Sequence, residues 1–313
     1  MRAYSVQRFG DAPAIADIPM PQAPDAYLIR VTYAGVNPVD YKSVESLTAK
    51  SAYPYVVGVD FAGVLEERVS SSERDLHAGD RVFGIARTQG TYAEYTVVPV
   101  GAQGSAVARI PDGVADDQAA ALPTPGITAL GSVELNGVAA GQWFVVMGAT
   151  GGVGGYAVQI AKARGAHVIA TVRGDADEAR RLGAEEVYDS QTTDVIAAIK
   201  AKHPQGVDAV LDLVNGPDAI RHDADMLKAG GHLVSTVGAA DAAWFAERRI
   251  TTHNIASRTN PLASREGLTE LGRLLAAGTI TARITTTEPL DAAGALLDRL
   301  RHGGVRGKAV IRT

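Results

Sequence analysis

The sequence predicts an α/β protein in which a doubly wound parallel sheet is inserted into a mostly antiparallel β domain. From about residue 123 to 257, strands that are apolar throughout alternate with helices, which is typical of a parallel sheet covered on both faces. Before it, short β-type runs are separated by Gly, Pro and Asp, as in antiparallel domains. The last segment returns to mixed elements and is expected to pack on the first. We therefore predict one domain from residues 1–122 and 258–313, and a second from residues 123–257.

The elements of the first domain are predicted from β-type runs bounded by turn residues at Gly35, Gly79-Asp80 and Pro111–Gly113. The four clearest strands are Tyr27–Tyr33, Ala62–Val69, Arg81–Ile85 and Tyr92–Val98. The closing segment adds helices at Arg265–Ala277 and Ala292–Arg301, and strands at Ala282–Thr286 and Lys308–Arg312. The Pro123–Gly126 run is expected to be a hinge between the domains.

The elements of the second domain follow from alternating periodicities. Its predicted strands are Phe144–Met147, Val168–Val172, Glu186–Tyr188, Ala209–Val214, His232–Val237 and Thr252–Ser257. Its predicted helices include Ile127–Leu135, Ala176–Leu182, Thr193–Lys202 and Asp218–Leu227.

A glycine-rich loop follows the first of these strands. Ala149-x-Gly151-x-x-Gly154 fits the dinucleotide fingerprint G-x-G-x-x-G, with alanine in the first position. A helix at Tyr156–Arg164 and a stop at Gly165-Ala166 complete a strand–turn–helix–strand unit. Small residues also serve plain strand–helix packing, but the whole unit favours a Rossmann domain that binds a pyrophosphate at the helix N-terminus.

The cofactor is indicated by Arg173, at the end of the second strand, about twenty residues past the glycines. Enzymes that use NAD place Asp or Glu there to bind the ribose 2′-hydroxyl. A guanidinium would instead pair with a 2′-phosphate. The position predicts NADPH, although a solvated surface arginine is the alternative.

Composition narrows the classes of protein. The chain has 313 residues, of which 46% are hydrophobic and 21% charged, and its net charge is −5. The sequence thus lacks the excess of positive charge that is typical of proteins that bind nucleic acid or an anionic membrane. Apolar runs fall short of the ~20 residues needed to cross a bilayer, and the N-terminus lacks a signal-peptide core, so we expect a cytoplasmic protein.

Metal and thiol chemistry are not expected. The chain has no cysteine, which rules out disulfides, thiol nucleophiles and thiolate zinc sites. Composition leaves metal sites of histidine alone, or of histidine and carboxylates, open. The seven histidines, however, are scattered, without an H-x-x-H or H-E-x-x-H pair, and are best explained as surface or core-edge residues. We predict no metal site.

Nine runs spread over the chain resemble one family. Among them are AGVNPVDYK (34–42), GVDFAGV (58–64), GDRVFG (79–84), GTYAEYTVVP (90–99), LPTPGITAL (122–130) and GATGGVGGYAVQIAKARGAHVIATVR (148–173), followed by LGAEEVYD (182–189), GGHLVSTVG (230–238) and GKAVI (307–311). Together they resemble the zinc-independent NADPH:quinone oxidoreductase (zeta-crystallin-like) branch of the medium-chain dehydrogenase/reductase superfamily. The resemblance implies that the antiparallel domain is GroES-like, and that the last strand of the parallel sheet pairs two copies into a homodimer.

The chain departs from the zinc-bearing branch of that superfamily. Asn37 stands where a cysteine ligand is expected, and Val59-Asp60 replace His-Glu after Gly58. Without Zn²⁺ there is no Lewis acid to acidify an alcohol. The resemblance therefore implies hydride delivery from NADPH to an electrophilic acceptor. We expect a quinone, with α,β-unsaturated carbonyls (enones or enoyl thioesters) as the alternative. A nucleotide-binding structural or RNA-binding protein is the non-enzyme alternative, and the acidic charge disfavours RNA.

The resemblance also implies roles for particular residues. The pyrophosphate would be bound by Thr150, Gly151, Gly152, Val153 and Gly154, and the 2′-phosphate by Arg173 with Ser190. Val214 and Asn215 would contact the adenosine, and Val237 and Gly238 the nicotinamide. Asn37 would lie near the nicotinamide, where its amide orients the carboxamide or polarises a substrate oxygen; a turn residue before Pro38 is the alternative. Thr124 and Thr128 would contact the cofactor or cap the helix near Ile127, and Arg306 and Lys308 would reach the cofactor or lie on the surface.

A general acid is sought between the Asn37 turn and Gly58. Tyr41, Lys42, Tyr53 and Tyr55 lie in this interval, and related enoyl reductases use a tyrosine from it as proton donor. Tyr53-Pro54-Tyr55 equally suits aromatic packing at a strand entry. Quinone reduction can take its proton from water, so the predicted reaction does not require such a residue.

Overall fold

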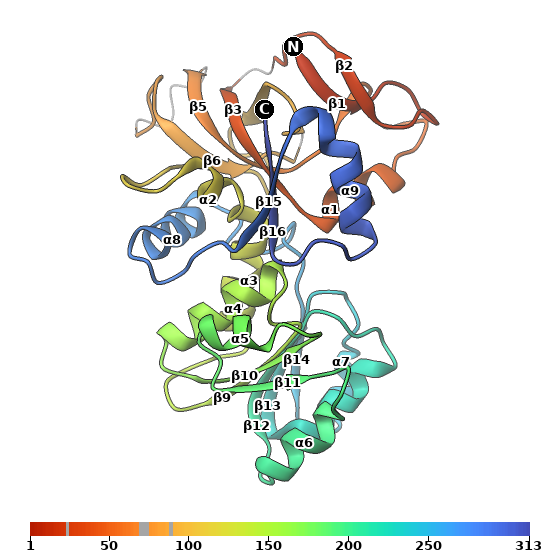
Figure 1. The fold of residues 1–313 in the computed structure, drawn as a ribbon, viewed down its shortest axis with the longest axis vertical. Helices are drawn as coiled ribbons and strands as arrows, with labels where there is room; N and C mark the ends of the chain where they lie inside the picture. Colours follow the sequence, from red (N-terminus) through yellow and green to blue (C-terminus); the bar gives the residue numbers. More distant parts are fainter. Residues whose placement is uncertain (23–24, 69–74, 88–89) are drawn as a thin grey trace. The chain divides into compact units, whose positions relative to one another are not determined.

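The computed structural model describes residues 1–22, 25–68, 75–87 and 90–313 (Figure 1). These residues form two compact units. Unit 1 comprises Met1–Ile127 and Leu262–Thr313, and unit 2 comprises Thr128–Pro261. Val69, the last residue of the predicted strand Ala62–Val69, lies outside the described residues. None of the described helices combines the length and the apolar character needed to cross a bilayer.

Unit 2 contains a six-stranded sheet whose ladders are all parallel. Its spatial order is β11-β10-β9-β12-β13-β14, so chain order reverses between β9 and β12. Ligands of such sheets bind beyond the carboxyl ends of the strands at this switch point. The strands are β9 (Trp143–Met147), β10 (His167–Val172), β11 (Glu186–Asp189), β12 (Val207–Asp212), β13 (Leu227–Ser235) and β14 (Thr251–Asn254). The predicted Rossmann fold is confirmed.

Helices cover both faces of this sheet. Because parallel crossovers are right-handed, the reversal of strand order moves the later helices to the second face. Accordingly, α4 and α5 lie on one side, and α6 and α7 lie on the other (Figure 1). Buried side chains of η1 share one core with those of α6 and α7. The second face holds a core of aliphatic side chains with Met226 and Phe245. The helices are α4 (Gly152–Ala163), α5 (Ala176–Arg181), α6 (Val195–Lys202), the 3₁₀ helix η1 (Ala219–Met226) and α7 (Ala242–Ala246).

Two local predictions need correction. The Pro123–Gly126 run, expected to be a hinge, forms the first turn of α3 (Pro123–Leu135), because proline is tolerated in the first turn, where a backbone N–H would have no partner within the helix. The predicted helix Asp218–Leu227 is the 3₁₀ helix η1. The pattern of apolar residues that favours an α-helix over such a short span does not distinguish it from a 3₁₀ helix.

Unit 1 is built on antiparallel strands, as predicted for the GroES-like domain. A small sheet has the order β2-β1-β4, and the main sheet has the order β15-β16-β3-β5-β6-β8, with β7 also paired to β3. Its elements are β1 (Arg2–Val6), β2 (Ala14–Asp17), β3 (Ala26–Val36), α1 (Pro38–Glu45), β4 (Tyr55–Val56), β5 (Asp60–Arg68), β6 (Arg81–Ile85), β7 (Tyr95–Pro99), β8 (Ala106–Arg109), α2 (Asp116–Ala120), α8 (Arg265–Ala276), β15 (Ile284–Pro289), η2 (Leu290–Ala292), α9 (Ala293–Arg301) and β16 (Lys308–Arg312).

The closing strand of the chain, β16, lies between β15 and β3 in the main sheet. β16 pairs antiparallel with β3, with Ala309 opposite Val36, and parallel with β15. Buried side chains of β3 and β16 pack with α9 in one apolar cluster. This pairing brings the last strand beside the end of β3, where Asn37 follows.

Candidate functional site

Three strand ends of unit 1 converge on Asn37. β3 ends at Val36, immediately before Asn37, which is the N-cap of α1. β5 begins at Asp60, which lies opposite Gly35 in the ladder. β16 begins at Lys308. The sheet therefore assembles polar residues that are far apart in the sequence.

Hydrogen bonds join these residues into a buried network. The Asn37 side-chain amide donates from Nδ2 to Asp60 Oδ2 (2.8 Å), and its Oδ1 accepts from Lys308 Nζ (2.7 Å). Lys308 Nζ also donates to the Val36 carbonyl (2.8 Å). Asp60 accepts further bonds from the Thr124 hydroxyl (2.6 Å) and backbone N–H (3.0 Å). Lys308 is 5% exposed, which argues against the surface alternative for this residue.

A second buried carboxyl, Asp40, extends the network. Its Oδ2 accepts from the Asn37 backbone N–H (2.7 Å) and from the Tyr92 hydroxyl (2.8 Å), while its Oδ1 is buried with no hydrogen-bond partner among the described residues. Gly58 leaves room for Tyr92, because a Cβ there would lie 2.4 Å from the Tyr92 ring. Sequence reasoning missed Asp40 and Tyr92 as members of the site.

Burial controls the charges of this network. It raises the pKa of Asp40 to about 7, against the hydrogen bonds from Asn37 and Tyr92. It also raises the pKa of Asp60, although Lys308 and the Thr124 and Asn37 donors favour the ionised form. Burial lowers the pKa of Lys308 to about 8, and the two carboxyls oppose this shift. The ammonium is the cation that compensates both acids.

The other predicted residues of unit 1 stand outside this network. Tyr41 is half-buried and Lys42 is exposed on α1, and neither has a hydrogen bond or ion pair to another described residue through its side chain. Tyr53 donates its hydroxyl to the Thr48 carbonyl (2.9 Å). Arg306 is exposed just before β16.

The glycine loop of unit 2 fits a pyrophosphate. Gly151 is the N-cap of α4 without a side-chain cap, and the N–H groups of Gly152, Val153 and Gly154 have no partner in the described part of the chain. A Cβ on Gly154 would lie 2.3 Å from the Gly148 carbonyl oxygen, so glycine is required for helix and strand to approach. Thr150 is partly exposed beside them. Three open donors at the positive end of a twelve-residue helix suit an anion.

Arg173 lies at the neighbouring strand end. β10 and β11 pair with Val172 opposite Asp189, so Arg173 and Ser190 both follow the ends of paired strands. Ser190 donates its hydroxyl to the Val172 carbonyl (3.1 Å). Arg173 is exposed, and no described residue forms a hydrogen bond or ion pair with its guanidinium. Asp189 is the carboxylate at this corner, and its two oxygens accept backbone N–H groups of Gly174 (3.0 Å) and Gln191 (2.9 Å).

Apolar surface borders the same edge of the sheet. β12 and β13 pair with Asp212 opposite Ser235, and the segments after them carry Val214-Asn215 and Val237-Gly238. Val214 is 58% exposed and Val237 49% exposed, which is unusual for large aliphatic side chains. They offer contact surface for a flat ring. Thr128, by contrast, is buried within α3.

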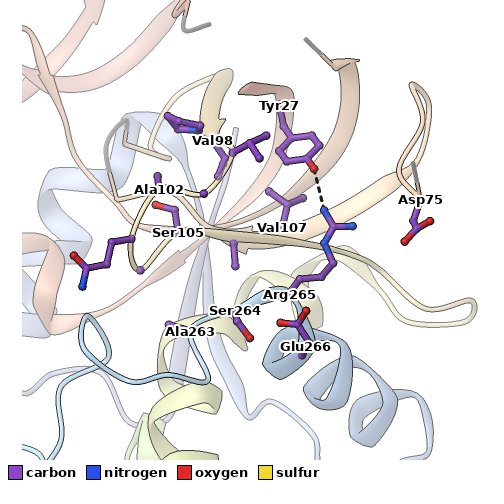
Figure 2. Close-up of a pocket in the computed structure, with 16 residues that line it drawn as sticks. Tyr27, Asp75, Val98, Ala102, Ser105, Val107, Ala263, Ser264, Arg265 and Glu266 are labelled. Carbon is purple, nitrogen blue, oxygen red and sulfur yellow. Dashed lines mark hydrogen bonds between the residues drawn. The ribbon is translucent and has the colours of Figure 1, made fainter. Parts of the chain in front are cut away.

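A separate pocket of about 610 Å³ lies on unit 1, lined by residues 98–107 and 263–266 with Tyr27 and Asp75 (Figure 2). At one side Arg265 donates to the Tyr27 hydroxyl (2.9 Å). None of the predicted site residues lines this pocket.

Comparison with known proteins supports the fold and the class of activity. Residues 23–112 match the model of the alcohol dehydrogenase GroES-like domain, and residues 152–277 match that of the zinc-binding dehydrogenase. The chain is 33% identical to the quinone oxidoreductase of Sus scrofa over 248 residues, which cover 75% of this chain and 72% of that protein. It is 29% identical to the chloroplast envelope quinone oxidoreductase homolog of Arabidopsis thaliana, covering 94% and 91%. The solved structure of the quinone oxidoreductase from Coxiella burnetii superposes with a TM-score of 0.86 at 29% identity, covering 100% and 99%.

Proposed function

Because the chain belongs to the medium-chain dehydrogenase/reductase superfamily and is an oxidoreductase, we propose that it reduces quinones with NADPH and without zinc. The observation that carries the cofactor choice is the exposed, unpaired Arg173 at the end of β10. An acidic residue at this position would repel a 2′-phosphate, whereas a guanidinium pairs with it in a bidentate manner.

Different residues of unit 2 would bind different parts of the cofactor. The open N–H groups of Gly152, Val153 and Gly154 would bind the pyrophosphate, with the Thr150 hydroxyl beside them. Arg173 would hold the 2′-phosphate. The exposed side chains of Val214 and Val237 would contact the adenosine and nicotinamide rings of the cofactor. When bound, NADPH supplies a hydride to an electron-poor acceptor.

The network of unit 1 supports a reaction without zinc. Asn37 Oδ1 and both oxygens of Asp60 already accept hydrogen bonds, so these oxygens are engaged. The buried Lys308 ammonium would also repel a divalent cation at this position. Without a Lewis acid the acceptor must itself be electrophilic, as quinones are. The Lys308 bond fixes the orientation of the Asn37 amide, so that its oxygen is engaged as an acceptor and its NH₂ group, which donates one N–H to Asp60, would have a second N–H left to donate.

Turnover is the direct test of this function. The absorbance at 340 nm measures the consumption of NADPH by purified protein. We expect this consumption to be faster with a quinone than with an enone. With the same quinone, we expect NADPH to be consumed faster than NADH. Gly154→Val serves as the inactive control, because the valine side chain would collide with the Gly148 carbonyl and close the pyrophosphate site. Turnover with enones alone would favour the enone reductase. Cofactor binding without any turnover would favour the structural alternative.

Metal content provides a second test. Because Lys308 supplies the positive charge beside Asn37 and Asp60, purified protein should contain no stoichiometric zinc, and chelation should leave activity unchanged. Elemental analysis by mass spectrometry measures this. One tightly held zinc per chain, lost together with activity, would contradict the proposal.

We also propose that the protein is a homodimer formed through β14. This strand pairs with β13 on one side, and its other edge has no strand partner in the described residues. Its sequence Thr251–Asn254 carries no acidic or lysine side chain. The opposite edge strand β11, by contrast, carries Glu186, which forms ion pairs with Lys202 and His203, and charged groups at a sheet edge disfavour pairing with another strand. Light scattering at micromolar concentration should give twice the chain mass of 32.5 kDa, and a monomeric mass would refute the proposal.

A further inference from the structure

Two carboxyl groups, Asp212 and Asp223, meet in the interior of unit 2. Asp212 is the last residue of β12, and Asp223 lies in η1; both residues are fully buried. Both acids contact Asn215, since Asp212 Oδ1 accepts its backbone N–H and Asp223 Oδ1 lies 3.5 Å from its side-chain Nδ2. The Oδ2 atom of each acid is buried and has no hydrogen-bond partner among the described residues.

One proton resolves this arrangement. Two ionised carboxylates in contact away from water would repel each other strongly, and no buried cation of the described residues compensates them. Burial, together with the charge and hydrogen bond of Asp212, raises the pKa of Asp223 to about 9. At neutral pH Asp223 is therefore protonated, and its O–H can donate to Asp212, as in other coupled acid pairs.

The pair also shapes the turn that follows β12. Asp212 Oδ1 accepts the backbone N–H groups of Val214 (2.7 Å) and Asn215 (2.8 Å). Asn215 Nδ2 makes a long contact of 3.5 Å with Asp223 Oδ1. Both acids thus contact the turn that carries the exposed Val214 side chain at the carboxyl edge of the sheet.

We propose that Asp212 and Asp223 share one proton and thereby hold the Val214-Asn215 turn in the conformation that receives the cofactor. Both are positioning residues, because they touch the turn and not the reacting atoms. The part of the proposal that concerns the cofactor rests on the proposed function; the part that concerns the turn does not.

Other charged groups near η1 are directed to the surface. Asp208 of β12 is half-buried. The other charged side chains on η1 and on the elements packed against it are exposed: Arg221, His222 and Asp225 of η1, Lys200 and Lys202 of α6, and Asp241 before α7. Asp208 is engaged with Lys228 and the Trp143 N–H. The pH response of the turn is thus assigned to the acid pair.

The decisive variant is Asp223→Asn, whose neutral amide can donate to Asp212 without a titratable proton. In wild type the folded state keeps the Asp223 proton up to about pH 9, whereas the unfolded chain loses it near the ordinary value of 3.8. The free energy of unfolding of wild type should therefore fall relative to the variant between these two pH values and level off above them. Asp225→Asn, an exposed change on the same helix, should keep the wild-type profile.

Measurements without cofactor test the turn. Hydrogen exchange of the Val214 and Asn215 amides, corrected for intrinsic base catalysis, should lose protection in wild type as pH rises through about 9 and keep it in Asp223→Asn. The difference between the infrared spectra of wild type and Asp223→Asn at pH 7 should contain the carbonyl band of a protonated acid, because the contribution of Asp40 is common to both proteins and cancels. A missing band, or the same alkaline loss of protection in the variant, would overturn the shared proton.

Cofactor binding tests the remaining step. Asp212→Ala removes the acceptor of two backbone N–H groups and should weaken NADPH binding about tenfold with kcat nearly unchanged. If NADPH binds wild type but its affinity is insensitive to this change while the turn loses protection, the link to the cofactor is wrong. If NADPH does not bind wild type at all, the proposed function fails and the exchange and infrared results alone decide the pair.

Discussion

Replacing Lys308 by methionine is expected to destabilise unit 1 by about 3–5 kcal/mol, the range for removing one partner of a buried ion pair. The ammonium lies between the Asn37 side chain and the Val36 carbonyl, and its charge offsets those of Asp40 and Asp60. Methionine fills a similar volume but leaves these acids without their cation. Equilibrium denaturant unfolding, followed by a probe in unit 1, measures the loss.

The pH dependence separates the charge effect from a packing defect. Without Lys308 the pKa values of Asp40 and Asp60 should rise further, so the folded state would bind more protons than the unfolded chain. Stability of the variant should be closest to wild type at acidic pH and fall further behind as pH rises toward 8. Asp60→Asn added to Lys308→Met should recover part of the loss. Lys50→Met, at an exposed position, should be nearly neutral. A penalty independent of pH would indicate packing alone.

The nucleotide half of the candidate site could be predicted because it is local in sequence. The strand, the glycine turn, the helix and Arg173 follow one another within about thirty residues, and each step has a known signature. The required glycine at position 154 is explained by a contact with Gly148, only six residues away. The doubly wound order of the sheet follows from the same alternation of strands and helices.

The network of unit 1 could be predicted only in part, because its contacts are non-local. Asn37 and Lys308 are 271 residues apart, and Asp40 and Tyr92 are 52 apart. Each residue separately fits a commonplace role, such as a turn, a strand end or a buried aromatic. Weak signals existed: Asp60 interrupts an apolar run, and Asp40 follows Asn37 at the spacing of a capping box. The short strands β1, β2 and β4 escaped notice because long-range pairing, not local pattern, defines them.

The Asp212–Asp223 pair lies beyond sequence reasoning for a related reason. Asp212 lies in a predicted apolar strand and Asp223 in a predicted helix, and only the packing of η1 against β12 brings both acids to the same turn. A buried acid pair violates the usual burial preferences, and such violations are expected at functional sites.

Substitution of Arg173 should separate the two nicotinamide cofactors. If its guanidinium pairs with the 2′-phosphate, Arg173→Ala removes charge-assisted hydrogen bonds worth about 1.5–3 kcal/mol, which corresponds to roughly a 10- to 150-fold weaker binding of NADPH. Because Arg173 is exposed, the loss should lie near the lower end and shrink with added salt. NADH has no phosphate at this position, so its binding should barely change.

Arg173→Asp should go further and shift the preference toward NADH, since a carboxylate repels phosphate and accepts from a ribose 2′-hydroxyl. Asp189 sharpens the test because it already places a negative charge at the corner. Asp189→Asn should therefore not weaken NADPH binding. Arg301→Ala removes the same charge from an exposed pair with Glu45 and should leave both affinities unchanged. Fluorescence or calorimetric titration with both cofactors measures these constants. Equal binding of NADH and NADPH by wild type, or equal weakening of both by Arg173→Ala, would show that Arg173 is only a surface charge and that the cofactor assignment is wrong.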